Sequence, residues 1–438
     1  MLGINTRLNQ LAQQGRSINI ALAGIGQMGI SLLSQIKDVQ GMKVVAVANR
    51  HAESISRRLG QHDLIEGKSE VISAGSMAPD KMKAQAELAA KENRMVFTDS
   101  LELLTSLDQV DIVMDATGSP EAGAAISMAA IENKKHMVSL NVEADVTVGP
   151  MIKKLANKKG LVYTIGAGDE PGALKELYDF ATALGFTVVA AGKGKNNPLD
   201  RSANPTTLAD YSKMKGANPR MMTSFVDGTK SMEEMACFSN ATGILPDVRG
   251  MHGPQANVDQ LTKIFASRQQ GGILNRVPAV DFAIGDVAPG VFLVYTTTNQ
   301  VLKDELKYLL FGDGPNYLLY RPYHLASMEV PLSAALAYFY QQPTITPLGA
   351  PRSQVITVAK KDLAKGEFID SIGGYTVYGL IEEYHRARSQ DLIPLGMVEG
   401  AELTVDVAKG QPITSKMVNI DEHTPLYKLR KMQEQTYG

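Results

Sequence analysis

The sequence is poor in cysteine, in long apolar runs and in charge of one sign. Its one cysteine, Cys237, cannot form an internal disulfide, and no Cys/His cluster has the spacing of a zinc site. No stretch approaches the roughly 18 consecutive apolar residues of a spanning helix, so we expect no membrane partner. Residues 1–16 are polar and lack the apolar core of a secretory signal. Together these absences predict a cytoplasmic protein.

The charges nearly cancel, because 44 Lys and Arg residues face 46 Asp and Glu residues, a formal net charge of −2. A near-neutral balance gives no electrostatic reason to bind a polyanion, so we expect no nucleic-acid partner. The composition, 21% charged and 44% hydrophobic, is typical of a globular protein. A length of 438 residues predicts two or three domains, each with its own core.

Residues 1–160 alternate short β-branched runs with helical stretches. This alternation predicts an α/β fold, a Rossmann doubly wound parallel sheet covered on both faces. The region Val71–Met95 is interpreted as an insertion around one crossover helix. The expected strands are Ser17–Ala23, Val44–Ala48, Val110–Ala116 and His136–Leu140, and the expected helices are Ile30–Val39, Lys81–Lys91 and Pro120–Asn133.

Residues 161–342 mix strands with long polar loops and predict an α+β domain that binds the substrate and carries the catalytic residues. Its last helix, Met328–Tyr340, is a candidate to pack back on the Rossmann domain. A proline-rich linker, Pro343–Pro351, opens the last segment, residues 343–438. Two echoing runs in that segment, Asp362–Ile369 (DLAKGEFI) and Asp406–Ile413 (DVAKGQPI), indicate a small β-rich module. The expected strands of the middle segment are Leu161–Ile165, Thr187–Ala191 and Val291–Thr297.

The run GIGQMG follows the first expected strand and opens the first helix, which is the context of a dinucleotide-binding fingerprint. Its glycines allow a tight turn, close approach of the pyrophosphate and packing of helix on strand. The helix N-terminus then offers N–H groups to the phosphates. The predicted contacts from this run are Gly24, Gly26, Gln27, Met28 and Gly29.

The end of the second strand reads Asn49-Arg50-His51, where an acidic residue would hold the ribose of NAD. An arginine there can pair with a 2′-phosphate, so NADP(H) is favoured, although Arg50 could also be a solvated strand-end residue. Other strand ends point to the same edge of the sheet, where ligands bind. These contribute Thr117, Gly118 and Asn141, with ordinary turn chemistry as the alternative for the first two.

The segment Gly192–Pro198 (GKGKNNP) is the richest in chemistry. Two ammonium groups separated by glycine could bind a phosphate or carboxylate, stabilise an oxyanion or donate a proton. A solvated turn is the alternative. The predicted catalytic residues here are Lys193 and Lys195, and the predicted substrate contacts are Asn196 and Asn197.

Acidic residues also follow expected strands. Glu143, Asp145, Asp169 and Glu170 could be helix caps, acid–base carboxylates or oxygen ligands of Mg²⁺ or Mn²⁺. Arg321 and His324 flank Pro-Tyr and are candidates for binding an anionic substrate and moving a proton. His252 is a weaker candidate.

The GIGQMG fingerprint resembles the homoserine-dehydrogenase-like group of NAD(P)-dependent oxidoreductases. Later motifs of the chain resemble more specifically the deoxyxylulose-5-phosphate reductoisomerase-like branch of that group. The Lys-Gly repeats after Pro351 resemble the C-terminal SAF module of that branch. The motifs that carry the likeness are NVEADVTVGP (Asn141–Pro150), GAGDEP (Gly166–Pro171), AGKGKNNPL (Ala191–Leu199), ATGILPD with GMHGP (Ala241–Pro254) and RPYHL (Arg321–Leu325).

The resemblance implies NADPH-dependent conversion of 1-deoxy-D-xylulose 5-phosphate to 2-C-methyl-D-erythritol 4-phosphate, and a homodimer. Homoserine dehydrogenases place a catalytic lysine after the strand-end Asn, whereas Asn141 here is followed by Val142 and Glu143, which counts against homoserine. In the resulting interpretation, Glu143, Asp169 or Glu170 exchanges the hydroxyl proton. The alternatives are a dehydrogenase of another sugar-derived, polyol or hydroxy-acid substrate, and a non-catalytic NADP sensor.

Overall fold

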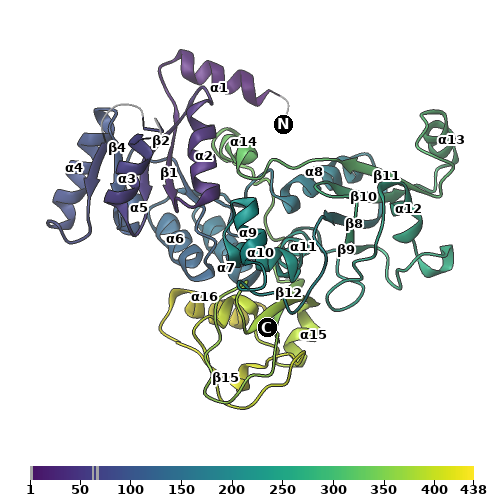
Figure 1. Cartoon of the computed structure of the whole chain (residues 1–438). Helices are drawn as coiled ribbons and strands as arrows, with labels where there is room; N and C mark the ends of the chain where they lie inside the picture. The colour runs from purple at the N-terminus through teal and green to yellow at the C-terminus, as the bar shows by residue number, and fades with distance from the viewer. Residues whose placement is uncertain (1–2, 62–63, 66–68) are drawn as a thin grey trace. The chain divides into compact units, whose positions relative to one another are not determined.

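The computed structural model describes residues 3–61, 64–65 and 69–438, which form two compact units (Figure 1). The first unit comprises Met1–Asp169, Leu325–Thr346 and Leu429–Thr436. The second comprises Glu170–His324, Pro347–Lys428 and the last two residues. In the described part of the chain, no helix is both long and apolar enough to cross a membrane.

A seven-stranded sheet forms the centre of the first unit, in the order β3-β4-β2-β1-β5-β6-β7. Every neighbouring pair runs parallel, so the predicted Rossmann-like sheet is confirmed. Consecutive residues of β1, which point to opposite faces of the sheet, are buried, as expected where helices cover both faces. The strands are β1 (Ile18–Ala23), β2 (Met42–Ala48), β3 (Ser69–Ile72), β4 (Met95–Thr98), β5 (Ile112–Asp115), β6 (His136–Ser139) and β7 (Tyr163–Ile165).

Helices connect these strands, and α3, α4 and α5 lie beside β2 and β4 (Figure 1). The region Val71–Met95 is not an insertion: it completes β3, forms α4 and begins β4, a regular crossover of the sheet. The helices are α1 (Ile4–Gln13), α2 (Gln27–Lys37), α3 (Ala52–Gln61), α4 (Pro79–Lys91), α5 (Leu101–Ser106), α6 (Pro120–Glu132) and α7 (Val142–Lys158).

Two later segments of the chain complete the first unit. After a short 3-10 turn (Ala326–Glu329), α14 (Val330–Tyr340) shares a core with β1, in which Val330 and Ala334 lie with Leu22. Part of α16 (Pro425–Tyr437) bonds to α7 beside Pro150, a residue that has no N–H to give to the hydrogen bonding of that helix. The side chain of Gln433 accepts a hydrogen bond from Met151 N and donates one to Thr147 O, both 3.2 Å.

A four-stranded sheet organises the second unit, in the order β11-β10-β8-β9. β8 pairs parallel with β9 and antiparallel with β10, and α8 and α11 pack on this mixed sheet (Figure 1). Its strands are β8 (Thr187–Lys195), β9 (Ala279–Ile284), β10 (Val291–Thr296) and β11 (Asn316–Arg321), and its helices are α8 (Glu170–Ala183), α9 (Ala209–Lys215), α10 (Pro219–Val226), α11 (Thr229–Thr242), α12 (Leu261–Ile264) and α13 (Gln300–Tyr308), with 3-10 turns at Val258–Gln260 and Arg268–Gln270.

β8 runs four residues further than the sequence suggests, through Gly192–Lys195. In this part of the strand, a Cβ on Gly192 would meet Asp281 O at 2.4 Å, and one on Gly194 would meet Ala288 N at 2.2 Å. Since side chains alternate along a strand, the neighbouring Lys193 and Lys195 share the opposite face. The glycines therefore allow close backbone packing on one face while both ammonium groups lie on the other.

The C-terminal part of the second unit is a small β-rich module. The two echoing runs pair with each other: Leu363 and Val407 exchange two backbone hydrogen bonds of 2.9 Å. Asp362 accepts from Lys409 N at 2.7 Å, and Asp406 accepts from Lys365 N at 2.8 Å. The sequence echo is thus a local two-fold arrangement. The module contains β12 (Ser353–Ala359), β13 (Val377–Glu383), α15 (Tyr384–Ser389), β14 (Glu402–Leu403) and β15 (Val418–Asn419), with 3-10 turns at Leu395–Met397 and Ser415–Met417.

The packing at Gly194 leads to a stability prediction. Gly194→Ala should lower the free energy of unfolding by about 2 kcal/mol, because the methyl group meets backbone atoms that cannot turn aside. Gly60→Ala, in α3 with open space around its Cβ, is the matched control and should be neutral or stabilising. Urea denaturation of both variants measures the difference; equal effects would contradict the close packing of β8.

Candidate functional site

The glycine-rich turn after β1 lies at the point where the strand order reverses. Ala23 and Asp115, the last residues of β1 and β5, are direct partners. Gly24 has φ +91°, and a Cβ there would lie 2.8 Å from Ala116 O. A Cβ on Gly29 would lie 2.1 Å from Gly24 O, so helix α2 also packs closely on the turn. In open parallel sheets, this switch point is where nucleotides bind.

Gly26 leaves space for a ligand in front of the N-terminus of α2. It is the N-cap of α2, has no side-chain cap, and its Cβ position faces open space. Gln27 and Met28 form the exposed first turn of that helix. An open approach to an uncapped helix N-terminus fits the pyrophosphate of a dinucleotide, since the backbone N–H groups there need an acceptor.

The end of β2 carries the predicted 2′-phosphate contacts. Asn49 Oδ1 accepts a hydrogen bond from His51 N at 2.9 Å, which leaves Arg50 on the exposed tip of this turn. Arg58 on α3 donates to Ile25 O of the glycine-rich turn at 3.4 Å. Sequence reasoning missed Arg58, and the available signal was its place in the helix that follows β2.

Asn141 organises the ends of β5 and β6. Its side chain caps α7 by accepting from Ala144 N at 3.0 Å, and it donates to Asp115 at 3.0 Å and to Ser119 O at 2.7 Å. Asp115 is fully buried and also accepts from Thr117 N and Oγ1, at 2.8 and 2.6 Å. Burial raises the pKa of Asp115, which these donors oppose. The predicted contacts Thr117 and Asn141 are therefore engaged in shaping the edge, beside the open Cβ position of Gly118.

The predicted acids Glu143 and Asp145 lie in the first turn of α7, as the helix dipole favours. Asp145 is buried and accepts from Tyr163 OH at 3.0 Å, so it serves the packing of α7 on β7. Asp169 is the last residue of the first unit in this part of the chain, and Glu170 begins α8 in the second.

In the second unit, Lys193 is held between two carboxylates. Its Nζ bonds Glu170 Oε1 at 2.5 Å and also bonds Glu234 of α11, and the side chains of Lys193 and Glu234 are 7% and 2% exposed. Burial alone would lower the pKa of Lys193, but the attraction of both carboxylates outweighs it and raises that pKa above its usual value. Sequence reasoning missed Glu234; the available signal was the acidic pair Glu233-Glu234 between Met232 and Met235.

Lys195 is also buried, at 4% exposed, but its hydrogen bonds go to the carbonyls of Asn197 and Pro198 at 2.9 and 3.2 Å. Burial lowers the pKa of Lys195 to about 8, and the positive charges of Lys193 and Arg201 contribute to this decrease. The negative charge of Asp227 acts in the opposite direction. Two lysines on one strand face thus differ in protonation: one is a fixed cation and the other titrates near physiological pH.

The remaining predicted residues divide between this cluster and its surroundings. His324 Nε2 lies 3.5 Å from Glu170 Oε1, which extends the chain of polar groups to four residues, in the order Glu234, Lys193, Glu170 and His324. Arg321 instead pairs with Glu176 at 3.1 Å. Asn196 is exposed, and Asn197 accepts from Tyr211 OH at 3.3 Å.

His252, the weaker candidate, belongs to a separate polar group. Its Nδ1 lies 2.8 Å from Asp281 and its Nε2 lies 3.3 Å from Asp247. The hydrogen bond to Asp281 raises the pKa of the imidazole, although burial opposes this. Asp281, within β9, also accepts from the backbone N–H groups of His252 and Gly253, so this group holds the turn at these two residues against the strand.

Comparison with known families is consistent with this arrangement. Residues 24–165 match the model described as homoserine dehydrogenase, NAD binding domain. Residues 168–330 match the model described as oxidoreductase DRL, catalytic domain. The chain is an NAD(P)-binding oxidoreductase. The two matched ranges hold the glycine-rich turn of the first unit and the lysine–carboxylate cluster of the second, respectively.

Solved structures include distant matches to this oxidoreductase, while no curated protein matches its sequence. A probable dehydrogenase from Thermotoga maritima is 13% identical, over 76% of this chain and 90% of that one, with a TM-score of 0.41. DOX-P reductoisomerase in complex with magnesium is 16% identical, over 76% and 72%, with a TM-score of 0.39. Biliverdin reductase from Synechocystis sp. PCC 6803, with biliverdin and NADP+, is 16% identical over 42% and 49%, with a TM-score of 0.25.

Replacing either buried lysine of the oxidoreductase with methionine should change its stability, in opposite directions for the two positions. Lys195→Met should raise the free energy of unfolding at pH 7 by about 1–2 kcal/mol, because it removes a buried cation whose ammonium group donates to the neutral carbonyls of Asn197 and Pro198. Lys193→Met should lower it by about 3 kcal/mol, because it leaves Glu170 and Glu234 without their cation.

The stabilisation expected from Lys195→Met depends on pH. The folded-state pKa of Lys195, about 8, lies below its unfolded value, so the folded chain binds fewer protons between these values and stability rises with pH there. The gain in the free energy of unfolding from Lys195→Met should therefore be largest below pH 8 and should decrease toward pH 10. Denaturation series at several pH values measure it, and a constant difference would refute the lowered pKa.

Proposed function

We propose that this chain is an NADPH-dependent oxidoreductase of a phosphorylated or acidic sugar-derived substrate. The reaction to test first is conversion of 1-deoxy-D-xylulose 5-phosphate to 2-C-methyl-D-erythritol 4-phosphate. The observation that carries the proposal is the pair of buried lysines on β8: Lys193 fixed between Glu170 and Glu234, and Lys195 with a pKa of about 8. A buried, titrating amine in a domain matched to an oxidoreductase catalytic family is a typical catalytic group.

The residues divide the chemistry as follows. Lys195 donates a proton or hydrogen bond to the substrate oxygen that becomes negative, and its pKa near neutrality suits both gain and loss of a proton. Glu170, bonded to Lys193 and close to His324, exchanges the hydroxyl proton that a C–C migration requires. When bound, the reduced nicotinamide supplies the hydride. Asn196, Asn197 and Arg321 are the candidates for holding the anionic group of the substrate.

For the cofactor, we infer a preference for NADPH over NADH. The end of β2 offers Asn49 and the exposed Arg50 where NAD-binding folds place an acid. Arg58, beside Ile25 of the glycine-rich turn, adds a second guanidinium. A 2′-phosphate pairs with planar guanidinium groups through charge-assisted hydrogen bonds.

Three further features belong to the same proposal. The reciprocal pairing of the two Lys-Gly runs supports a SAF-like identity for the C-terminal module. Glu170 and His324 each carry an atom that could ligate Mg²⁺ or Mn²⁺, but Glu170 Oε1 already bonds an ammonium group, so a metal would compete with Lys193. A cytoplasmic homodimer without a nucleic-acid or membrane partner completes the proposal.

Two other functions use the same residues. A dehydrogenase of another polyol or hydroxy acid would need the same proton donor, Lys195, and activity on such substrates with none on 1-deoxy-D-xylulose 5-phosphate would favour it. A non-catalytic NADP sensor would bind NADPH and turn over neither class of substrate. The two buried lysines argue against a sensor, since burying the Lys195 ammonium group against the neutral carbonyls of Asn197 and Pro198 costs stability that nucleotide binding does not require.

Cofactor selectivity can be tested without a substrate. Arg50→Ala should weaken NADPH binding about tenfold, the loss of one charge-assisted interaction, and leave NADH binding unchanged. Arg57→Ala is the control, because Arg57 is exposed and pairs with Glu53 on α3. Calorimetric titration with both nucleotides measures the effect; equal weakening of the two would refute the phosphate-pairing role.

Turnover tests the catalytic proposal. Lys195→Met should reduce kcat with 1-deoxy-D-xylulose 5-phosphate by about 100-fold or more and leave NADPH affinity intact, because it removes only the proton donor. Lys263→Met, at an exposed lysine of α12, should match the parent chain. Loss of NADPH absorbance measures the rate. Undiminished turnover in Lys195→Met would exclude Lys195 from the chemistry, and no turnover by the parent chain would exclude this substrate.

A further inference from the structure

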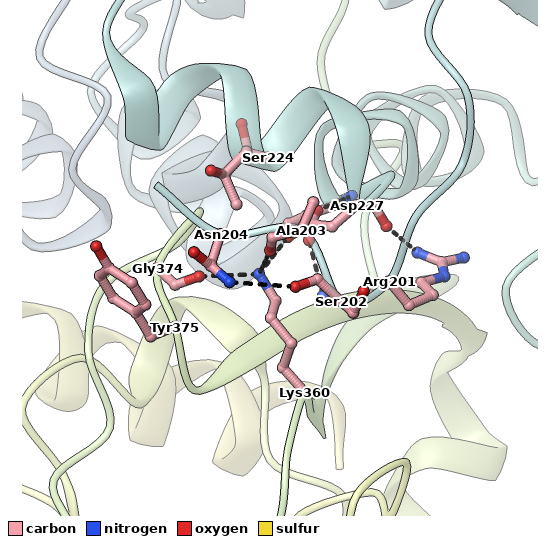
Figure 2. A network of polar contacts seen from close by, with 12 residues as sticks. Arg201, Ser202, Ala203, Asn204, Ser224, Asp227, Lys360, Gly374 and Tyr375 are labelled. Carbon is pink, nitrogen blue, oxygen red and sulfur yellow. Dashed lines mark hydrogen bonds and ion pairs between the residues drawn. The ribbon is translucent and has the colours of Figure 1, made fainter. Parts of the chain in front are cut away.

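Lys360, directly after β12 in the C-terminal module, is a buried lysine outside the cluster described above. Its side chain is 3% exposed. Figure 2 shows the Nζ group at the centre of a polar network, where it donates to Ala203 O at 2.8 Å, Asp227 Oδ2 at 2.9 Å and Gly374 O at 2.9 Å. An ammonium group has three donors, and all three are used. The site is therefore fully satisfied and specific for a lysine.

Asp227 connects this lysine to the catalytic domain. It ends α10, is fully buried, and accepts from Thr229 N at 2.9 Å with its second carboxylate oxygen. Its backbone carbonyl accepts from the Arg201 guanidinium at 2.5 Å (Figure 2). The chain between Arg201 and Ala203 is thus held at both ends, by Arg201 on Asp227 and by Lys360 on Ala203.

This anchored stretch directly continues the segment that follows Lys195. Only residues 196–200 separate Lys195 from Arg201, and the carbonyls of Asn197 and Pro198 in that segment bond the Lys195 ammonium group. The charged groups that act on Lys195 are Lys193 on the same strand, Arg201 in the following loop and Asp227 before α11. Within the described part of the chain, Asp227 is the acid that acts on Lys195, and Lys360 donates a hydrogen bond to it.

We propose that Lys360 is a positioning residue of the catalytic site: by neutralising Asp227 and anchoring Ala203, it fixes the electrostatic environment of Lys195 and the loop that bonds it. A buried ion pair of this kind is weak evidence for stability, because desolvation offsets much of its attraction. Its proximity to a titrating lysine gives it a second effect. The inference rests on the proposed role of Lys195 as the proton donor.

The sign of the effect follows from the charges. Lys360→Gln keeps amide donors for the carbonyls but removes a positive charge, so Asp227 attracts the Lys195 ammonium group more strongly and the pKa of Lys195 rises. Asp227→Asn keeps the shape but removes the negative charge, so that pKa falls. We expect shifts of about one pH unit in these opposite directions. Lys361→Gln is the matched control, since the neighbouring Lys361 is 52% exposed and pairs with Glu367.

The experiment is an NMR titration of the 13Cε resonance of Lys195 in the full chain, assigned by its loss in Lys195→Arg. It requires no substrate, so its outcome is independent of whether 1-deoxy-D-xylulose 5-phosphate is turned over. A midpoint that rises in Lys360→Gln, falls in Asp227→Asn and stays in Lys361→Gln supports the proposal. An unchanged midpoint in a folded Lys360→Gln or Asp227→Asn variant overturns the proposal. If one of these variants does not fold, the other still tests the proposal, because each has its own expected direction of shift.

Discussion

The burial of two ammonium groups on one face of β8 is the constraint on which the second unit depends. Transfer of a charge out of water costs several kcal/mol unless partners replace the hydration shell. Lys193 obtains two carboxylates, one from the first residue of α8 and one from α11, so these helices must present Glu170 and Glu234 to the same strand face. Lys195 obtains the carbonyl oxygens of Asn197 and Pro198, which stabilise the charge less than carboxylates do, and burial lowers its pKa to about 8. Because the partners of the two lysines differ in charge, Lys193 stays a cation that holds the helices together, whereas Lys195 titrates near physiological pH.

Glycine performs a different task in each unit. At Gly26 the missing side chain leaves space open in front of a helix N-terminus, which is what a pyrophosphate needs. At Gly194 the backbone of Ala288 occupies the space that a side chain would fill, which leaves no space for a ligand on that face of the strand. The first glycine creates a binding surface, and the second closes one face of β8, so that the chemistry of the strand is confined to the face of Lys193 and Lys195.

The sequence predicted those features whose signals are local. The parallel sheet follows from the alternation of strands and helices, and the nucleotide turn follows from three glycines within six residues. The end of β8 was predicted as a polar loop because Gly-Lys repeats lack the β-branched residues typical of strands. The partners of the lysines were out of reach: Glu234 lies 41 residues from Lys193, and Lys360 lies 133 residues from Asp227. No local pattern encodes such pairs, and only packing of buried charges on distant elements reveals them.

The charge balance of the whole chain hides this organisation. A net charge of −2 describes a protein in which acids and bases cancel, yet the cancellation is local and uneven. Around β8, Lys193 is matched by two acids, and Asp227 is matched by Lys360, which belongs to the C-terminal module rather than to the catalytic domain. Because buried charges are weakly screened, removal of any one of them changes the field at its neighbours more than exposed charges do. The module is thus joined to the catalytic domain through the Lys360–Asp227 ion pair, and through that pair it bears on the protonation of Lys195.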